Sequence, residues 1–367
     1  MFKKLSQSNF IDMLLEKLKF AFSKFQHNSE FKLYQELASG HINSTYLIIT
    51  ESKPNFVLQC INDNVFNDVQ GLILNKFNIS THLKEKLKDL SKDELYSSVL
   101  TFIETKEGKP YYRAKDGSCW NLMNYIDDSI TFETVDDKEV AYEAGKLFGG
   151  FLNLTYDYDA TKLIDVIPEF HDMFFRFSQF QKAIKASSKE RLAKSQECID
   201  FAFELKEEMH IIQNLKESGK INVRVTHNDT KISNALFSKS NKGLCVIDTD
   251  TVMPGIVHYD FGDAIRTICN EAAEDETNLD LVEFNMEYYK AYEKGFLEKI
   301  RTTLTSLELQ YLPLGAKTMM FIMGLRFLTD YLNNDVYYKI KYAEHNLDRA
   351  KNQFKLVQSF SKKMNQL

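Results

Sequence analysis

The stretch VTHNDTKISNALF, from Val225 to Phe237, places a histidine, an aspartate and an asparagine in a short polar segment between β-branched and apolar residues. Asp229 and Asn234 are five residues apart, which is the spacing found in catalytic loops that transfer a phosphoryl group. In such loops the aspartate accepts the proton of an acceptor hydroxyl and the asparagine is a ligand of Mg²⁺. A polar turn can contain the same residues by chance, so the flanking sequence has to be considered.

Residues in and after the polar loop are expected to support the reaction of a phosphate. Lys231 is expected to act with Asp229 at the reacting phosphate, whereas His227 is expected to support the loop. Fourteen residues after Asn234, the apolar run GLCVI ends in Asp248. A carboxylate at the end of a buried strand is costly to desolvate unless a cation meets it, and Mg²⁺ would supply that cation. We therefore predict Asn234 and Asp248 as metal ligands; the alternative is a turn-forming aspartate.

The letters DFG in YDFGD (Tyr259–Asp263) invite assignment as the metal-binding motif of protein kinases. Asp260, however, lies 26 residues after Asn234 and follows MPGIVHY instead of an apolar strand. We expect Asp260 and Asp263 to support the site, as a helix cap or as partners of Arg266 and of the polar loop.

Upstream of the polar loop, short runs rich in aromatic and β-branched residues predict an antiparallel sheet with one main helix on it. An amphipathic helix is expected before the sheet, because apolar residues recur at helical spacing from Phe10 to Phe25. The predicted strands lie in YQELASGHINSTYLIIT (34–50), NFVLQCIN (55–62), SSVLTFIET (97–105) and KPYYRAKDGSCWNLMNYID (109–127), and the main helix in NVFNDVQGLILNKFNISTHLKEKL (64–87).

From about Thr134 onward the pattern becomes mostly helical. Helices are predicted in 137–155, in 189–215 as one continuous helix, and in the tail from Leu312. We therefore expect an α+β protein of two lobes: a small β-rich lobe over residues 1–125 and a larger helical lobe over residues 126–367. A ligand site is expected between such lobes.

A glycine-containing loop separates the first two predicted strands, in LASGHINSTYLI. Gly40 would let the backbone approach phosphates, and His41 and Asn43 beside it are expected to take part in nucleotide binding. A plain hairpin fits this segment equally well.

The bulk composition excludes some classes of protein. The net charge is −6 with no long basic block, so neither nucleic acid nor an anionic membrane is expected as a partner. The five cysteines are far apart and odd in number, which argues against a disulfide framework and favours a cytoplasmic setting. The apolar run Met319–Leu328 is too short to span a bilayer. The composition gives no indication of the oligomeric state.

Several segments together resemble the N-acetylhexosamine 1-kinases, which belong to the aminoglycoside-phosphotransferase-like superfamily. The resemblance runs from about Leu37 to Phe354 and is carried by GHINSTYLI, FVLQCIN, HNDTKISN, VIDTDTVMPG, YDFGDAIR, EAAEDE, GLRFLTDYL and HNLDRAKNQ. It implies a two-lobed, protein-kinase-like fold and ATP- and Mg²⁺-dependent phosphorylation of the anomeric hydroxyl of N-acetylglucosamine or N-acetylgalactosamine.

The resemblance also implies roles for individual residues. Asp229 would be the base, with Asn234 and Asp248 on the metal, and Tyr125 would lie at the hinge that contacts adenine. Arg326 and Tyr337 would recognise the sugar; alternatively, Arg326 pairs with an acid and Tyr337 lies in a core.

Two positions depart from the expected pattern. Gln59 stands where protein kinases carry a lysine that binds phosphates, if FVLQ aligns with VAIK. An amide brings no charge, so Lys231 and Mg²⁺ would have to neutralise more of the nucleotide. Cys60 stands where an arginine is expected. Two alternatives therefore stay open: a related kinase acting on homoserine, choline, methylthioribose or an aminoglycoside, and a nucleotide-binding pseudokinase.

Overall fold

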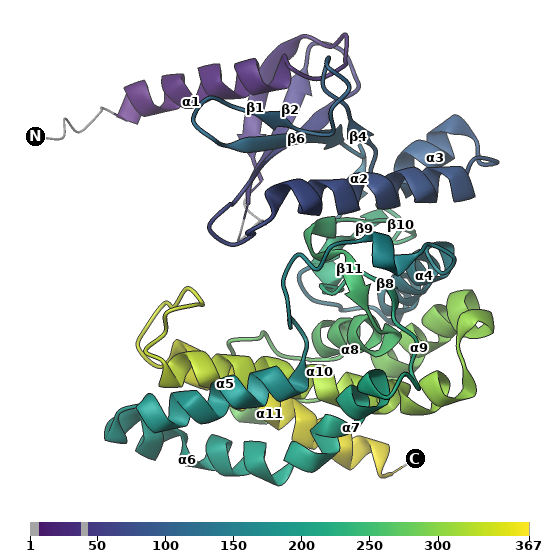
Figure 1. The fold of residues 1–367 in the computed structure, drawn as a ribbon. Coiled ribbons are helices and arrows are strands. Elements are labelled where there is room, and N and C mark those ends of the chain that lie inside the picture. The colour runs from purple at the N-terminus through teal and green to yellow at the C-terminus, as the bar shows by residue number, and fades with distance from the viewer. Residues whose placement is uncertain (1–6, 38–42, 367) are drawn as a thin grey trace, which may run out of the picture. The chain divides into compact units, whose positions relative to one another are not determined.

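The aromatic and β-branched runs of the first third form an antiparallel sheet in the computed structural model, which describes residues 7–37 and 43–366. The strand order is β1-β2-β3-β6-β4, with β5 paired to β6, and all these pairs are antiparallel. The predicted sheet is thus confirmed. Its strands are β1 (Phe31–Glu36), β2 (Ser44–Thr50), β3 (Phe56–Ile61), β4 (Phe102–Ile103), β5 (Tyr112–Arg113) and β6 (Cys119–Asn124) (Figure 1).

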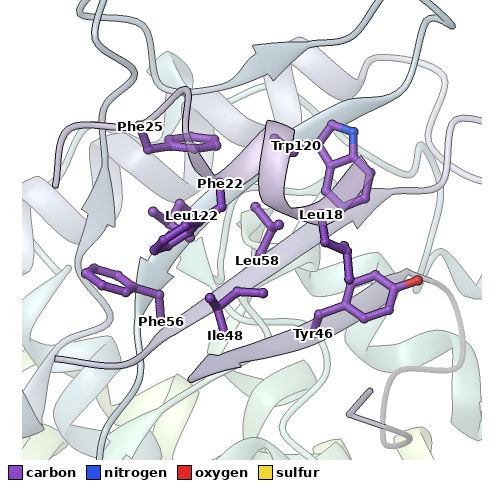
Figure 2. Packing of buried hydrophobic residues seen from close by; sticks show 10 residues of the cluster. Leu18, Phe22, Phe25, Tyr46, Ile48, Phe56, Leu58, Trp120 and Leu122 are labelled. Atoms are coloured by element: carbon purple, nitrogen blue, oxygen red, sulfur yellow. The ribbon is translucent and has the colours of Figure 1, made fainter. Parts of the chain in front are cut away.

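Helix α1 (Gln7–Phe22) packs its apolar face on this sheet, as the helical spacing predicts. Figure 2 shows the resulting core, in which side chains of α1 and of the turn after it interleave with side chains from β2, β3 and β6. Burial of large apolar side chains is the main favourable term in folding, so α1 is an integral part of this lobe. The cluster contains Leu18, Ala21, Phe22, Phe25, Tyr46, Ile48, Phe56, Leu58, Trp120 and Leu122.

The predicted main helix is α2 (Val69–Lys86), which begins where Asp68 accepts a hydrogen bond from the backbone N–H of Gly71 at 2.8 Å. One strand prediction was wrong at its start. Residues 97 and 98 end helix α3 (Lys92–Ser98) instead of opening a strand. The cause is a capping box in which Ser91 and Glu94 satisfy each other's backbone N–H groups.

The second half of the chain is mainly helical, as predicted. Helices α4 and α9 can approach closely because Gly145 of α4 has no side chain. A Cβ at this position would lie only 2.2 Å from the backbone oxygen of Tyr292 in α9. The helices are α4 (Lys138–Leu154), α5 (Met173–Ala186), α6 (Lys189–Glu204), α7 (Lys206–Glu217), α8 (Val257–Ile268), α9 (Met286–Ile300), α10 (Ser306–Leu332) and α11 (His345–Met364) (Figure 1).

The predicted continuous helix over 189–215 is instead two helices, α6 and α7, that meet at Leu205. Helix α6 packs against α10 and α11, whereas α7 packs against α5 and α10. A change of direction lets each half bury its own apolar face. Apolar periodicity does not reveal such a change, because both halves keep the helical rhythm.

The chain divides into two compact units that do not follow a single cut in the sequence. Unit 1 consists of Met1–Ser129, Lys162–Val166 and Cys245–Val252, and unit 2 of Ile130–Thr161, Ile167–Leu244 and Met253–Leu367. The expected lobe boundary between residues 125 and 126 stays a prediction. Within residues 7–37 and 43–366, none of the helices is both long and apolar enough to cross a membrane.

Short strands complete the framework around the polar loop. β8 (Arg224–Thr226) leads into this loop and pairs antiparallel with β11 (Met253–Gly255). β9 (Ala235–Ser238) follows the loop, and β10 (Gly243–Val246) precedes Asp248. β7 is Ser129–Ile130.

A buried histidine in unit 2 makes the stability of the fold depend on pH. His258, at the start of α8, donates from Nε2 to the backbone oxygen of Glu308 at 3.0 Å, and burial lowers its pKa from 6.5 to about 4. The unfolded chain therefore binds a proton more readily, and stability is lost as the pH falls below 6.5.

At pH 5 this linkage amounts to about 2 kcal/mol from His258 alone. We expect the free energy of unfolding, measured by urea denaturation at pH 7 and pH 5, to fall less for His258→Gln than for the wild type, by about that amount. Glutamine can still donate to the Glu308 carbonyl. An equal loss in both proteins would contradict the assignment.

Candidate active site

A buried carboxylate holds the polar loop at its start. Asp260, on α8, accepts hydrogen bonds from the backbone N–H groups of His227 and Asn228, both at 2.7 Å. The hydroxyl of Thr230 donates to the backbone oxygen of Asp260 at 2.6 Å. Burial raises the pKa of Asp260 to about 6, against the opposing effects of His227 and the two backbone donors. The expected support of the loop by Asp260 is thus confirmed, although Asp260 lies inside α8 and does not cap it.

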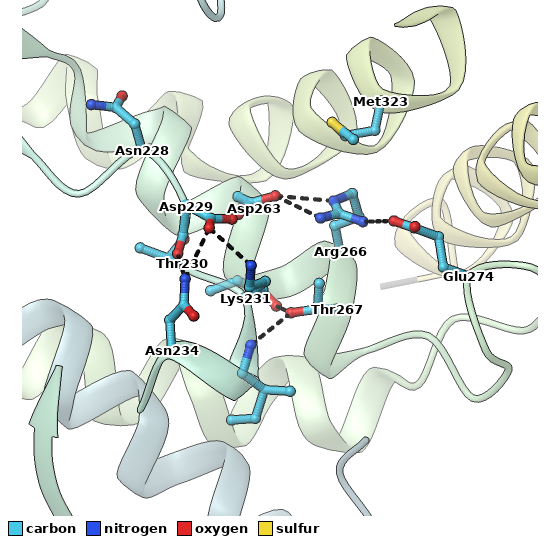
Figure 3. A network of polar contacts seen from close by, with 12 residues as sticks. Asn228, Asp229, Thr230, Lys231, Asn234, Asp263, Arg266, Thr267, Glu274 and Met323 are labelled. Carbon is cyan, nitrogen blue, oxygen red and sulfur yellow. Dashed lines mark hydrogen bonds and ion pairs between the residues drawn. The ribbon is translucent and has the colours of Figure 1, made fainter. Parts of the chain in front are cut away.

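This anchoring places Asp229, Lys231 and Asn234 together (Figure 3). Lys231 Nζ lies 3.0 Å from Asp229 Oδ2, and Asn234 Nδ2 donates to the same oxygen at 2.9 Å and to the backbone oxygen of Asp229 at 2.8 Å. Asn228, just before the aspartate, has a left-handed backbone with φ of 62°, which asparagine tolerates. Burial alone would raise the pKa of Asp229, but Lys231, His227 and Asn234 lower it overall. The carboxylate is therefore ionised at neutral pH and can accept a proton.

The orientation of Asn234 fits a metal ligand. Both hydrogen bonds of its amide nitrogen go to Asp229, so its carbonyl oxygen points away from that carboxylate (Figure 3). In the part of the chain that the structure describes, no three His, Cys, Asp or Glu side chains form a metal site. Mg²⁺ does not require such a group, because it commonly binds one or two carboxylates together with substrate phosphates and water.

Asp248, the second predicted ligand, follows β10 with a left-handed backbone of φ 57°. It belongs to unit 1, whereas Asp229 and Asn234 belong to unit 2. Its role on a shared metal therefore stays a prediction.

Asp263 and Arg266 form a buried ion pair beside the loop. Arg266 Nε and Nη2 both lie 3.0 Å from Asp263 Oδ1, and Arg266 Nη1 lies 2.7 Å from Glu274 Oε1 (Figure 3). This confirms the expected pairing of Asp263 with Arg266. The pair satisfies a carboxylate whose pKa burial raises, so it supports the fold around Asp229.

Unit 1 contains a buried polar cluster that the sequence reasoning missed. Lys76, on α2, forms an ion pair with Asp250 and donates to Gln59 Oε1 at 2.8 Å. Asn43 also donates to Asp250, and Asn121 donates to Gln59 Oε1 at 3.3 Å. Lys76 was detectable in principle, because it interrupts the apolar stripe of α2 formed by Leu72, Ile73 and Ile79.

Residues 34–297 match the phosphotransferase enzyme family. The chain belongs to this family. The matched residues include both the sheet of unit 1 and the polar loop of unit 2, which carries Asp229.

Three solved structures resemble this phosphotransferase over nearly its whole length. Amicoumacin kinase hAmiN in complex with AMP-PNP, Ca²⁺ and Ami is 13% identical, with a TM-score of 0.59, over 98% of this chain and 96% of that one. Spectinomycin phosphotransferase in complex with ADP and spectinomycin is 13% identical, with a TM-score of 0.59, over 97% and 98%. Choline kinase from Cryptosporidium parvum Iowa II is 12% identical, with a TM-score of 0.56, over 98% and 97%.

At these identities the likeness establishes the fold alone. The protein-kinase-like fold expected from the sequence, with an antiparallel sheet lobe and a helical lobe, is thereby confirmed. The narrower resemblance to N-acetylhexosamine 1-kinases concerns the acceptor, which the fold does not define.

Of the predicted nucleotide-binding residues in the loop between β1 and β2, the structure describes Asn43 alone. Gly40 and His41 lie outside the described residues. Asn43 uses its carbonyl oxygen to accept from the backbone N–H of Asn62 at 2.7 Å and its amide nitrogen to bind Asp250. Its predicted contact with nucleotide would therefore require these bonds to be shared or exchanged.

Tyr125 directly follows the last residue of β6. Its backbone N–H donates to Asn55 at 3.1 Å, and its backbone oxygen accepts from the hydroxyl of Tyr96 at 2.8 Å. Because both backbone groups are engaged, the predicted adenine contact of Tyr125 would come chiefly from its side chain.

The predicted sugar-recognition residues belong to α10 and the segment after it. The Arg326 guanidinium lies 4.9 Å from the ring of Phe170 and 5.8 Å from that of Tyr338, and it donates to Met323 Sδ at 3.4 Å. Arg326 makes no ion pair with any carboxylate in residues 7–37 and 43–366. Tyr337 is 64% exposed, so it is not a core residue. An ion pair for Arg326 and a core position for Tyr337 thus do not describe these residues, and their roles in sugar recognition stay predictions.

A second arginine was not singled out in the sequence. Arg176, on α5, donates twice to the backbone oxygen of Phe170, at 2.7 and 3.1 Å, and its pKa is lowered to about 10 by burial and by Arg326. Both guanidinium groups thus contact Phe170, Arg176 through its backbone oxygen and Arg326 through its ring. Next in the chain, His171 donates to the backbone oxygen of Asn228, the residue before Asp229.

Proposed function

We propose that this phosphotransferase is an ATP- and Mg²⁺-dependent kinase that phosphorylates the anomeric hydroxyl of an N-acetylhexosamine, N-acetylglucosamine or N-acetylgalactosamine, to the sugar 1-phosphate. The observation that carries the kinase assignment is the arrangement of Asp229, Lys231 and Asn234 on a loop held by Asp260. Two of the similar structures are complexes with an adenine nucleotide, AMP-PNP in one and ADP in the other, which favours an adenine nucleotide as the phosphoryl donor.

In the proposed reaction, Asp229 orients the anomeric hydroxyl and accepts its proton as the hydroxyl oxygen attacks the γ-phosphorus, while the bond from the γ-phosphorus to the β–γ bridging oxygen breaks and ADP leaves. Lys231, 3.0 Å from Asp229, keeps this carboxylate ionised and places a positive charge beside the transferred group. Asn234 and Asp248 would hold Mg²⁺, which when bound neutralises charge on the phosphates. Positioning and electrostatics supply most of the acceleration in such a transfer.

The acceptor side is supported by Arg176 and Arg326. Two guanidinium groups without a carboxylate partner among the described residues make this surface electropositive and rich in donors. A carbonyl such as that of an N-acetyl group can accept from an arginine, and an exposed aromatic ring such as Tyr337 suits the apolar face of a sugar. A quaternary ammonium or a polyamine would be repelled by both arginines.

The experiment that tests the proposal is a coupled ADP-release assay with Mg²⁺, ATP and a panel of acceptors. The panel contains N-acetylglucosamine, N-acetylgalactosamine, choline, an aminoglycoside, homoserine and methylthioribose. We expect the N-acetylhexosamines to give the highest kcat/KM. A higher kcat/KM for any of the other acceptors would overturn the sugar assignment, and no acceptor-dependent ADP release from any of them would favour a pseudokinase.

Replacing Arg326 with methionine tests the acceptor side separately. We expect the KM for N-acetylglucosamine to rise about tenfold or more, because a charge-assisted hydrogen bond contributes roughly 1.5–3 kcal/mol. The KM for ATP should stay within about twofold, since an acceptor contact does not act on the nucleotide.

The matched control is Arg349→Met on α11, which also removes a guanidinium that lies over an aromatic ring, that of Phe327 at 5.2 Å. It should leave the KM for the sugar unchanged. Equal effects of the two variants would contradict a specific role for Arg326.

A further inference from the structure

We propose that Lys76 is a positioning residue: through its ion pair with Asp250 it fixes the turn that carries Asp248 and the amide of Gln59. The inference rests on the proposed function, because it concerns the nucleotide side of the same reaction. It concerns the orientation of Gln59 and of the turn at Asp248; the expectation that Lys231 and Mg²⁺ neutralise more of the nucleotide stays a prediction.

The pair is almost completely withdrawn from water. The side chain of Lys76 is 2% exposed and that of Asp250 8% exposed. Burying two charges costs several kcal/mol per ion, and their attraction repays this only where the geometry is good and further hydrogen bonds are made. Apolar residues of similar volume would stabilise α2 at least as well. A buried pair at this position therefore needs a reason other than stability.

Each member of the pair is held by additional polar groups. Lys76 Nζ donates to Gln59 Oε1 at 2.8 Å, and Gln59 Nε2 donates back to Asp250 Oδ2 at 3.4 Å. Lys76, Gln59 and Asp250 thus form a closed ring of contacts. In consequence the amide of Gln59 has a single orientation, with its oxygen toward the ammonium group and its nitrogen toward the carboxylate.

A neighbouring residue of α2 binds the same segment. Asn75 Nδ2 donates to the backbone oxygen of Val252 at 2.9 Å, while Lys76 binds the side chain of Asp250. Helix α2 therefore holds both the short 3₁₀ helix η3 (Thr249–Thr251) and the residue after it. Asp248 directly precedes η3 with its left-handed backbone. Because Asp250 lies in η3, a displaced Asp250 would be expected to alter the backbone at Asp248 as well.

The charges are exchanged relative to the protein-kinase pattern. In protein kinases a lysine on the third strand pairs with a glutamate on the helix. Here the third strand, β3, carries the neutral Gln59, the helix carries the cation, and the anion lies two residues after Asp248. The ion pair therefore joins the helix to the predicted metal-binding turn and not to the strand.

The test measures Mg²⁺-dependent binding of AMP-PNP by calorimetry, together with the Mg²⁺ concentration for half-maximal activity in the full chain. Wild type is compared with Lys76→Met, with the neutral-pair variant Lys76→Gln/Asp250→Asn, and with Lys317→Met. The Lys317 control removes another mostly buried lysine, one that pairs with Glu208. The neutral-pair variant is included because removing one partner alone leaves a buried unpaired charge.

We expect the neutral-pair variant to fold, to require at least fivefold more Mg²⁺ and to bind Mg²⁺ and AMP-PNP at least fivefold more weakly, with the acceptor KM unchanged. Lys317→Met should match the wild type. Unchanged Mg²⁺ dependence in a folded neutral-pair variant would overturn the inference. Failure of the proposed function is recognised differently, as absence of acceptor-dependent ADP release in the wild type; the calorimetric comparison then still decides the role of Lys76.

Discussion

Asp229→Asn is expected to lower kcat about a thousandfold, because a positioned general base typically contributes 10²- to 10⁴-fold. The amide has nearly the same shape as the carboxylate but cannot accept the proton of the acceptor hydroxyl. Binding of ATP should change little, since Asp229 is proposed to contact the acceptor. The measurement is steady-state kinetics in the ADP-release assay, with AMP-PNP affinity determined in parallel.

The pH dependence of the wild type gives an independent check on Asp229. Its pKa is lowered overall by Lys231, His227 and Asn234, in spite of burial. The carboxylate therefore stays ionised below the usual aspartate pKa, and no loss of kcat from its protonation is expected between pH 8 and pH 5.

A surface control is Asp200→Asn on α6, where Asp200 accepts a hydrogen bond from Gln196 of the same helix. It should leave kcat unchanged. A kcat of Asp229→Asn within about tenfold of the wild type would exclude this residue as the base.

Asp260→Asn is expected to produce the second-largest effect, a loss of kcat of about a hundredfold through disorder of the catalytic loop. The Asp260 carboxylate accepts from two backbone N–H groups, whereas an amide offers one oxygen and turns an N–H toward the other donor. A buried donor left without an acceptor costs roughly 1–3 kcal/mol, so near pH 4, where Asp260 is still protonated in the wild type, the free energy of unfolding of the variant should be lower by about that amount.

The stability effect of Asp260 has a defined pH dependence. Its pKa rises from 3.8 in the unfolded chain to about 6 in the folded protein, chiefly through burial. The folded state therefore binds the proton more tightly, and the contribution of Asp260 to stability falls as the pH rises from about 4 to about 6. The difference in unfolding free energy between wild type and variant should decrease by about 3 kcal/mol over this window.

The matched control is Asp172→Asn, at the N-cap of α5, where asparagine caps as well as aspartate does. Urea denaturation at several pH values makes the comparison. A difference between wild type and Asp260→Asn that does not change with pH would contradict the raised pKa.

Much of the fold followed from sequence patterns, because each element is specified locally. The aromatic and β-branched runs of β2 and β3, the Asp68 cap of α2 and the apolar stripe of α4 are all readable within a few residues. The catalytic loop was readable for a similar reason, since Asp229 and Asn234 meet through their five-residue spacing.

What the sequence did not reveal depends on contacts between distant segments. Lys76 meets Asp250 across 174 positions of the chain, and Arg176 approaches Arg326 through their shared contact with Phe170. Buried charges of this kind follow no periodicity, and their partners are defined only by the folded topology. The end of α6 at Leu205 escaped prediction for the same reason, because its neighbours and not its own residues define it.

The composition of unit 1 has a consequence for how the protein is made. Its last stretch, Cys245–Val252, lies more than a hundred residues after Ser129, where the first stretch of the same unit ends. During synthesis, Lys76 can form its ion pair with Asp250 only after this stretch has left the ribosome. A fragment that ends at Ser129 would lack Asp250, and the ammonium group of Lys76 on α2 would have no counter-charge there. Separate expression of the first lobe should therefore yield an unstable product, whereas the same fragment carrying Lys76→Met should be more stable.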